Sequence, residues 1–190
     1  MQGPYRIDLD GKAHLRVLSE HDVTADYVRS LNDPVVHRFL VGPRSQTQTI
    51  DSVRGFVRRN VEDPASLLFG LFVADTLRGT IRLHDITAGR AFLGLAVFDR
   101  ALWGQGWGTR CVRAATRFAR EELNVSRVAA VIEADNAASL KVFDRAGYRC
   151  VADPVVQDGL CKQLWIFPEA GNPNDFTGLE TPPSNGRAME

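Results

Sequence analysis

Short apolar runs alternate with helix-like periodicity over the first 168 residues of the chain. Two runs, residues 7–9 and 14–18, flank Asp10-Gly11, which is a strong signal for a hairpin turn. Three further strand-like runs follow at residues 67–74, 79–86 and 91–98. Because only four residues separate each of these three from the next, they predict an antiparallel meander.

Four segments have the apolar spacing of helices: residues 19–31, 50–61, 109–123 and 137–146. Ser19 can cap the first of them, and Asn32-Asp33-Pro34 is expected to end it near residue 31. Asn136 is a suitable N-cap for the last, and Gly147 is a suitable C-terminal residue.

Three more strands complete the pattern. Residues 127–134 form a nearly continuous apolar run, which is typical of a strand buried on both faces. Residues 148–152 and 163–167 are the last predicted strands, joined by a polar loop over residues 153–159. A meander followed by a strand–helix–strand crossover predicts a mixed α/β (α+β) domain.

The last 22 residues, 169–190, differ from the rest because they contain three Gly, three Pro and no periodic apolar pattern. Such a segment buries too little apolar surface to offset the entropy lost on ordering. The sequence therefore predicts one domain over residues 1–168 and a disordered or loosely attached tail.

Composition narrows the function classes. The 190 residues include 23 basic and 23 acidic ones, so no general positive field favours nucleic acid. No apolar run approaches the roughly 20 residues of a membrane span, and the N-terminus lacks a signal-peptide core, which favours a cytoplasmic protein without membrane partners. Three widely spaced cysteines favour neither a disulfide framework nor a metal cluster.

The strongest local motif is the turn WGQGWGT at residues 103–109, between a predicted strand and a predicted helix. Glycines allow a ligand to approach the backbone, and a helix N-terminus favours an anion such as phosphate. A P-loop would need a lysine after the last glycine, and none is present. In a dinucleotide-binding fingerprint the third glycine comes one residue later, and an acidic residue follows sooner than Glu133 does here.

The turn resembles motif A of the GNAT family of N-acetyltransferases, [Q/R]-x-x-G-x-[G/A], with Gly106 and Gly108 at the small positions. Trp103 replaces the usual Gln or Arg, a form similar to the branch of ribosomal-protein N-acetyltransferases. Asn136-Ala-Ala-Ser139 with the later Ala-Gly147-Tyr resembles the family's N-x-x-S…G-[F/Y] motif, and Leu31-Asn-Asp-Pro34 resembles the end of its first helix. The resemblance covers residues 12–167.

This resemblance implies a GNAT fold, a mostly antiparallel, splayed sheet flanked by helices, and acetyl-CoA as co-substrate without a metal. The pyrophosphate would bind the turn, and the pantetheine arm would lie along the preceding strand and near the last helix. The implied cofactor-binding residues are Leu95, Ala96, Val97, Phe98, Trp103, Gly104, Gln105, Gly106, Trp107, Gly108, Thr109, Asn136 and Ser139.

Acetyl transfer to an amine also needs groups that move protons. Many family members use a tyrosine to protonate the leaving thiolate, but the matching position here is Phe143. Ser139 or a water would fill that role, or the thiolate leaves unassisted. Candidates for the base that deprotonates the substrate ammonium are His84, Asp85 and Glu133.

Residues 32–48 should form one wall of the acceptor pocket, where His37 and Arg38 are candidate acceptor-binding residues. We expect a small-molecule amine, such as an amino sugar, as acceptor. The alternatives are a protein N-terminal amine, as in the branch it resembles, and a non-catalytic acyl-CoA-binding module, which Phe143 favours. Monomer and homodimer are both compatible with the sequence.

Overall fold

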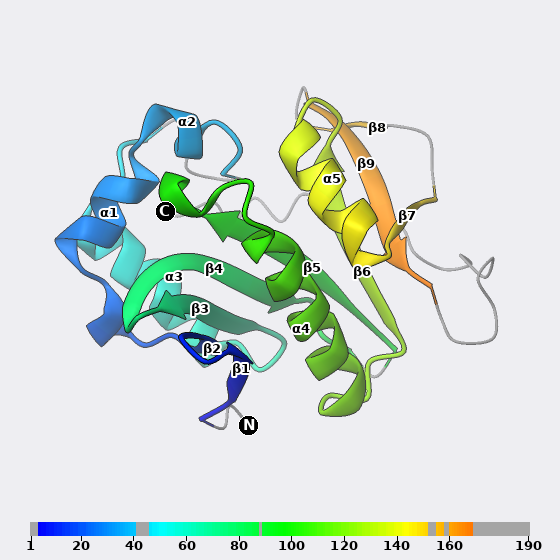
Figure 1. Ribbon diagram of the computed structural model, residues 1–190, viewed down its shortest axis with the longest axis horizontal. Helices are drawn as coiled ribbons and strands as arrows, with labels where there is room; N and C mark the ends of the chain where they lie inside the picture. Colours follow the sequence, from blue (N-terminus) through cyan, green and yellow to red (C-terminus); the bar gives the residue numbers. More distant parts are fainter. Residues whose placement is uncertain (1–3, 41–45, 88, 152–154, 158–159, 169–190) are drawn as a thin grey trace.

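The computed structural model describes residues 4–40, 46–87, 89–151, 155–157 and 160–168 (Figure 1). The predicted tail at residues 169–190 lies outside these ranges. The strands are β1 (Arg6–Asp10), β2 (Ala13–Val17), β3 (Leu67–Val73), β4 (Thr76–His84), β5 (Arg90–Val97), β6 (Arg127–Glu133), β7 (Arg149–Cys150), β8 (Val155–Gln157) and β9 (Leu160–Phe167). The helices are α1 (Ala25–Leu31), α2 (Pro34–His37), α3 (Ile50–Glu62), α4 (Trp107–Glu121) and α5 (Ala137–Ala146), with 3-10 turns η1 (Glu20–Asp22) and η3 (Arg100–Leu102).

Within the described ranges, nine strands form a single sheet in the order β1-β2-β3-β4-β5-β6-β9-β7, with β8 also paired to β9. The pairs from β1 to β5 are antiparallel, and so are those that β9 makes. Only β5 and β6 are parallel, because α4 carries the chain across the sheet between them. The predicted mixed α/β fold with a mostly antiparallel sheet is confirmed.

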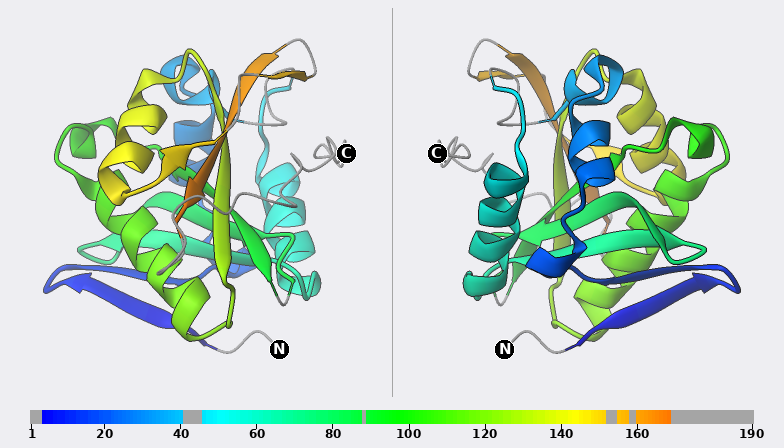
Figure 2. Two further views of the ribbon diagram at one scale, coloured as in Figure 1. Left: turned by 90° about the vertical axis from the view of Figure 1, so that its right-hand side faces the viewer. Right: turned by 90° about the vertical axis from the view of Figure 1, so that its left-hand side faces the viewer.

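Helices cover both faces of the sheet (Figure 2). Apolar residues of α4 and α5 pack on one face with alternate residues of the strands, among them Ile81, Leu83 and Leu93. On the other face α1 and α3 pack against residues such as Leu68 and Phe72. The strand alternation predicted from sequence therefore separates two cores, one on each side of the sheet.

The sheet is splayed at its centre. The register of β5 and β6 covers three pairs only, from Arg90 with Arg127 to Phe92 with Ala129. Beyond this point β5 continues beside β4 as far as Val97, while β6 continues beside β9 as far as Glu133. The two parallel strands therefore diverge toward their C-terminal ends (Figure 1).

The single helix expected over residues 19–31 is wrong. Ser19 begins only the short turn η1, where its backbone N–H donates to the Asp22 carboxylate at 2.8 Å. A second capping residue, Thr24, accepts from the Tyr27 N–H at 3.2 Å and begins α1. Two cap signals within six residues divide the segment, because each one satisfies the free N–H groups of its own turn.

Other boundaries also differ from the prediction: α4 begins at Trp107 and ends at Glu121, and β9 begins at Leu160. Pro34 ends the preceding helix as expected, but it is also the first residue of α2, which Asp33 caps. Fixed φ makes Pro favourable at that position. In the predicted polar loop at residues 153–159, Val155–Gln157 form β8, because the β-branched pair at 155 and 156 can extend the ladder on β9.

Gly79 positions the end of β5 that carries the glycine turn. A Cβ there would lie 2.8 Å from the Ala96 carbonyl oxygen, a backbone atom of β5. We expect Gly79→Ala to lower the free energy of unfolding by about 1–3 kcal/mol because β5 must shift. Gly94→Ala is the control, since its Cβ would meet no described heavy atom within 4 Å. Urea unfolding of both variants tests this, and equal stabilities would contradict it.

Candidate functional site

The divergence of β5 and β6 leaves a strand edge open in the middle of the sheet. Among the described residues, the β5 segment from Leu95 to Val97 pairs with β4 on one side and with no strand on the other. Such an edge offers backbone N–H and C=O groups to an extended ligand. The Trp103 indole N–H donates to the Val97 carbonyl at 2.7 Å, so this side chain covers the end of the edge.

The glycine turn follows this edge after the 3-10 turn η3 (Arg100–Leu102). Gly104 and Gly106 have φ of +75° and +82°, a conformation that favours glycine. Among the described residues, no heavy atom lies within 4 Å of a Cβ built on either glycine, so the space beside the turn is open. Backbone conformation and open space together fit a turn against which a ligand lies closely.

The turn leads into an α4 N-terminus without a side-chain cap. Gly106 is the N-cap residue and has no side chain to bond the first N–H groups. The Arg110 N–H donates to the Gly106 carbonyl at 3.1 Å, which is the first helical hydrogen bond. The N–H groups before it carry the positive end of the helix dipole. This arrangement can bind a phosphate group.

Other residues of the turn serve packing. A Cβ on Gly108 would lie 3.1 Å from the Val142 Cγ2 and 3.2 Å from the Leu95 Cδ2, so this glycine allows α4 to approach α5 and β5. The Gln105 side-chain amide donates to the Ala101 carbonyl at 2.6 Å. Trp107 packs against the core under α4.

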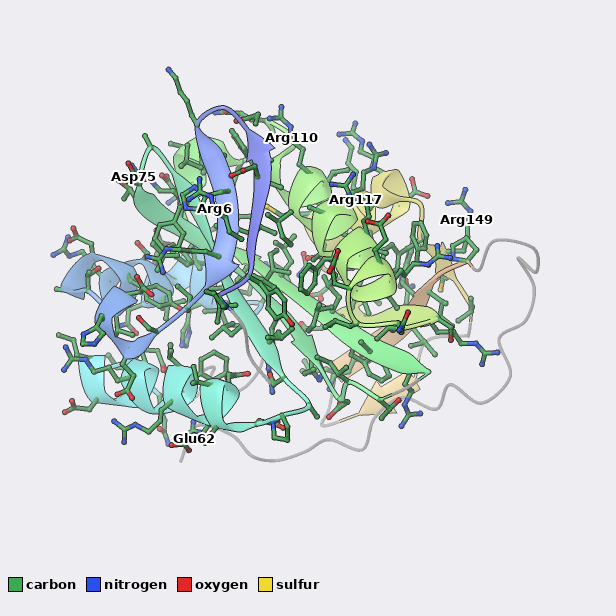
Figure 3. The ribbon with its side chains drawn as sticks, turned by 90° about the horizontal axis from the view of Figure 1, so that it is seen from below. Arg6, Glu62, Asp75, Arg110, Arg117 and Arg149 are labelled. Carbon is green, nitrogen blue, oxygen red and sulfur yellow. The ribbon has the colours of Figure 1, made fainter. Side chains whose placement is uncertain are left out.

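Arg110, in the first turn of α4, is held by the β1–β2 hairpin. Its guanidinium lies 2.8 Å from the Asp10 carboxylate and 4.6 Å from the centroid of the Trp107 ring. Figure 3 shows Arg110 beside this hairpin. An exposed acidic residue, rather than solvent alone, thus faces this arginine next to the turn.

The N-terminus of α5 carries two more of the predicted cofactor-binding residues, Asn136 and Ser139. The Asn136 side-chain oxygen accepts from the Ser139 N–H at 3.1 Å, so Asn136 is the N-cap, and Ser139 is half-buried. Phe143, at the position of the family's usual tyrosine, lies in the core with its ring edge-on to Tyr148 at 5.0 Å. No proton donor is present at this position.

His84 and Asp85 lie at the end of β4, beside the point where β5 and β6 begin to diverge. His84 pairs with Phe92 in the β4–β5 register, and its Nδ1 is 3.1 Å from the Asp85 Oδ2. Burial lowers the pKa of His84, and the nearby Arg82 cation lowers it further, while Asp85 acts in the opposite direction. The imidazole is therefore neutral at pH 7, with Asp85 in place to orient it.

Glu133 is buried at the other end of the divergence and pairs in register with Lys162. It lies four residues after Ala129, the register partner of Phe92. At about 3.3 Å per residue, Glu133 is about 13 Å further along β6 than the position of His84. The structure thus brings His84 and Asp85 together and places Glu133 apart from them.

The predicted acceptor-binding residues are on and beside α2. The Arg38 guanidinium lies 3.2 Å from the Asp135 carboxylate, which ties this segment to the turn between β6 and α5. His37 is half-buried, and its Nε2 is buried without a hydrogen-bond partner among the described residues. Both residues therefore lie on the side of the splay where β6 ends.

Sequence reasoning missed Arg82, which the structure places on β4 two residues before His84. The Arg82 guanidinium is half-buried, and its Nε lies 3.3 Å from the Ser66 hydroxyl oxygen. The alternation of strand residues was the available signal, since positions 82 and 84 of one strand share a face.

The described residues contain no group of three or more His, Cys, Asp or Glu side chains arranged to hold a metal ion. No helix in these residues has the length and apolar character needed to cross a membrane.

Comparisons with known proteins agree with the family resemblance seen in the sequence. A family model described as an acetyltransferase (GNAT) domain matches residues 12–149. The probable N-acetyltransferase YjcK of Bacillus subtilis (strain 168) is 36% identical over 85 residues, covering 42% of this chain. The alignment spans 46% of YjcK, less than half the length of that relative.

Solved structures share the fold at low identity. RimL, a ribosomal L7/L12 alpha-N-protein acetyltransferase in complex with coenzyme A, has a TM-score of 0.73 and 18% identity, over 85% of this chain and 97% of that one. The aminoglycoside acetyltransferase AAC(6')-Ib, in complex with ribostamycin and coenzyme A, has a TM-score of 0.69 and 15% identity, over 82% and 92%.

Proposed function

The chain belongs to the GNAT family of acetyltransferases, and from this we propose that it transfers the acetyl group of acetyl-CoA to a primary amine. The observation that carries the proposal is the open β5 edge followed, after the turn η3, by an uncapped, glycine-rich helix N-terminus. An extended arm that ends in a pyrophosphate needs these two features side by side.

In this proposal the pyrophosphate accepts hydrogen bonds from backbone N–H groups of the turn at residues 103–109, chiefly those of the three glycines, because the Trp103 and Gln105 N–H groups already donate to backbone carbonyls. The pantetheine arm lies along the β5 edge from Leu95 to Phe98. Asn136 contacts the arm through its side-chain amide nitrogen, because its oxygen already caps α5. Open space at Gly104 and Gly106 supports this fit.

The reaction is direct attack in a ternary complex. His84 takes a proton from the substrate ammonium, and Asp85 orients the imidazole. The amine nitrogen then bonds to the thioester carbonyl carbon, and a β5 N–H stabilises the oxyanion. The carbon–sulfur bond breaks, and the nitrogen releases its second proton as the amide forms. This proton reaches the thiolate through Ser139 or water, or it passes to solvent while the thiolate leaves unassisted, since the thiol pKa is roughly 8.5.

The proposed acceptor is a small-molecule amine such as an amino sugar. The solved structure of AAC(6')-Ib, which is similar in fold, is a complex with the aminoglycoside ribostamycin and coenzyme A. RimL, a protein N-terminal acetyltransferase, is also similar in fold, so a peptide amine is the alternative acceptor.

Incubation with acetyl-CoA and a panel of amino sugars, aminoglycosides, polyamines and peptides tests the proposal, with thiol release as readout. We expect release with at least one class of amine. Tight coenzyme A binding without release on any class would instead indicate a non-catalytic acyl-CoA-binding module, which Phe143 in place of a tyrosine would fit.

Asn136 has two roles in this proposal, and two variants separate them. Asn136→Asp keeps a good N-cap but replaces the amide nitrogen with a carboxylate oxygen, so we expect an unchanged melting temperature and weaker coenzyme A binding. Asn136→Ala removes the cap as well and should also cost about 1 kcal/mol of stability. Calorimetric titration and thermal melts measure both. Unchanged affinity in Asn136→Asp would leave Asn136 as a cap alone.

A further inference from the structure

β4 carries two partly shielded arginines whose surroundings differ. The Arg78 guanidinium forms an ion pair with the Asp99 carboxylate at 2.8 Å. Arg82, by contrast, has no carboxylate within ion-pair distance in the described part of the chain, and its Nε contacts the Ser66 hydroxyl at 3.3 Å. A cation shielded from water without an opposite charge is costly, so proteins usually pair it.

The surroundings of Arg82 leave this charge largely uncompensated. Its guanidinium carbon is 5.8 Å from the centroid of the Phe56 ring on α3, a weak cation–π distance. Asp85 and Asp63 act on Arg82 only beyond ion-pair distance, and burial lowers the pKa of Arg82 despite them. An anion that reached the guanidinium would therefore meet a partly dehydrated cation that no carboxylate of the described residues contacts.

Register places Arg82 at the start of the splay. Arg82 pairs with Gly94, and the next alternate residue, His84, pairs with Phe92, where pairing between β5 and β6 ends. Ile81 and Leu83 face the α4 core, so Arg82 and His84 share the opposite face of the sheet.

Open space lies beside Arg82 on that face. Paired residues of neighbouring strands point to the same side, so a Cβ on Gly94 would point toward the Arg82 face. Such a Cβ would meet no described heavy atom within 4 Å. The Arg82 guanidinium, which no described carboxylate contacts, therefore lies near the proposed base His84 and beside open space.

We propose that Arg82 binds an anionic group of the acceptor, so that the preferred substrates are amines that also carry a carboxylate or a phosphate. This inference rests on the proposed acetyl transfer and names its acceptor class. The planar guanidinium can bind either group through two parallel hydrogen bonds. The amine would then lie toward His84 and the diverging edge of β5. Polycationic amines would be repelled by the same charge.

Matched pairs of amines test the acceptor class. Glucosamine 6-phosphate against glucosamine reports a phosphate, and glycine against glycinamide reports a carboxylate, with spermine and ribostamycin as polycations. Thiol release from acetyl-CoA is followed for each. We expect a higher kcat/KM for the anionic member of at least one pair than for its partner and for both polycations.

Variants of Arg82 connect the preference to this side chain. Arg82→Gln should raise KM for the preferred anionic amine about 10- to 100-fold and leave its uncharged partner within about twofold. Arg82→Lys keeps the charge without the planar fork and should recover part of the loss. Arg59→Gln, an exposed arginine on α3, is the control for the change in net charge and should leave both KM values unchanged. Thermal melts establish that each variant is folded.

The outcomes separate this inference from the function on which it rests. Release with neutral or cationic amines but no preference for an anionic member would overturn the acceptor class and leave acetyl transfer intact. An equal rise of KM for charged and uncharged partners in Arg82→Gln would do the same. If none of the tested amines causes thiol release, the proposed function and this inference are overturned together.

Discussion

Replacing Gly106 with glutamate is expected to weaken coenzyme A binding by at least about 100-fold. The side chain would enter the open space beside the turn, where its carboxylate would repel the pyrophosphate. A tenfold loss of affinity corresponds to about 1.4 kcal/mol, so a 100-fold loss needs about twice that free energy. This is a modest repulsion for like charges in contact. Isothermal titration with coenzyme A measures the effect directly and does not depend on knowing the acceptor.

Controls separate the charge from the backbone. Gly106 has φ of +82°, a conformation that most side chains disfavour. Asn tolerates it better than other residues, so Gly106→Asn adds a side chain of similar kind without adding charge. We expect a much smaller loss of affinity for Gly106→Asn. Gly147→Asn, at the C-terminus of α5 with φ of +103°, should lower stability but not affinity. Wild-type affinity in Gly106→Glu would show that the pyrophosphate does not bind this turn.

Local signals predicted most of the fold. Asp10-Gly11 lies at the first hairpin, whose two-residue loop begins at Gly11. The meander has connections of two residues between β3 and β4 and of five between β4 and β5, so both signals act over a few residues. The prediction was wrong where two local signals competed, as with Ser19 and Thr24 as successive caps. β8 was missed although its signal is local: Asp158-Gly159, the same hairpin signal as Asp10-Gly11, separates it in sequence from its partner β9.

The candidate site was predictable only where it is contiguous in sequence. The turn at residues 103–109 carries its own glycines, and Asn136 with Ser139 forms a complete cap. Contacts between distant segments, such as Arg110 with Asp10, have no local pattern that reports them. Arg82 belongs to this second group, because only the sheet register reveals that Gly94 leaves space beside it.

Replacing His84 with glutamine is expected to lower kcat by about 10²- to 10⁴-fold, the usual contribution of a general base. Coenzyme A affinity should stay unchanged, because His84 pairs with Phe92, short of the β5 segment from Leu95 to Phe98 that is proposed to hold the pantetheine arm. Steady-state kinetics with the best amine and calorimetry with coenzyme A measure the two quantities. His21→Gln, an exposed histidine, is the matched control and should leave kcat unaffected.

The pH dependence of the wild-type protein provides a second test of His84. Burial and Arg82 lower its pKa below 6.5, so the neutral base is present at pH 7. The acid inflection of the kcat/KM profile should therefore lie below pH 6.5.

Asp85→Asn removes a group that raises this pKa, so it should move the inflection to still lower pH. The unfolded chain binds this proton more tightly, so the free energy of unfolding should also decline as the pH falls through about 6.5. Near-normal kcat in His84→Gln, with its acid limb unmoved, would assign the proton transfer to Glu133 or water instead, because the lowered pKa of His84 would then have no counterpart in the rate.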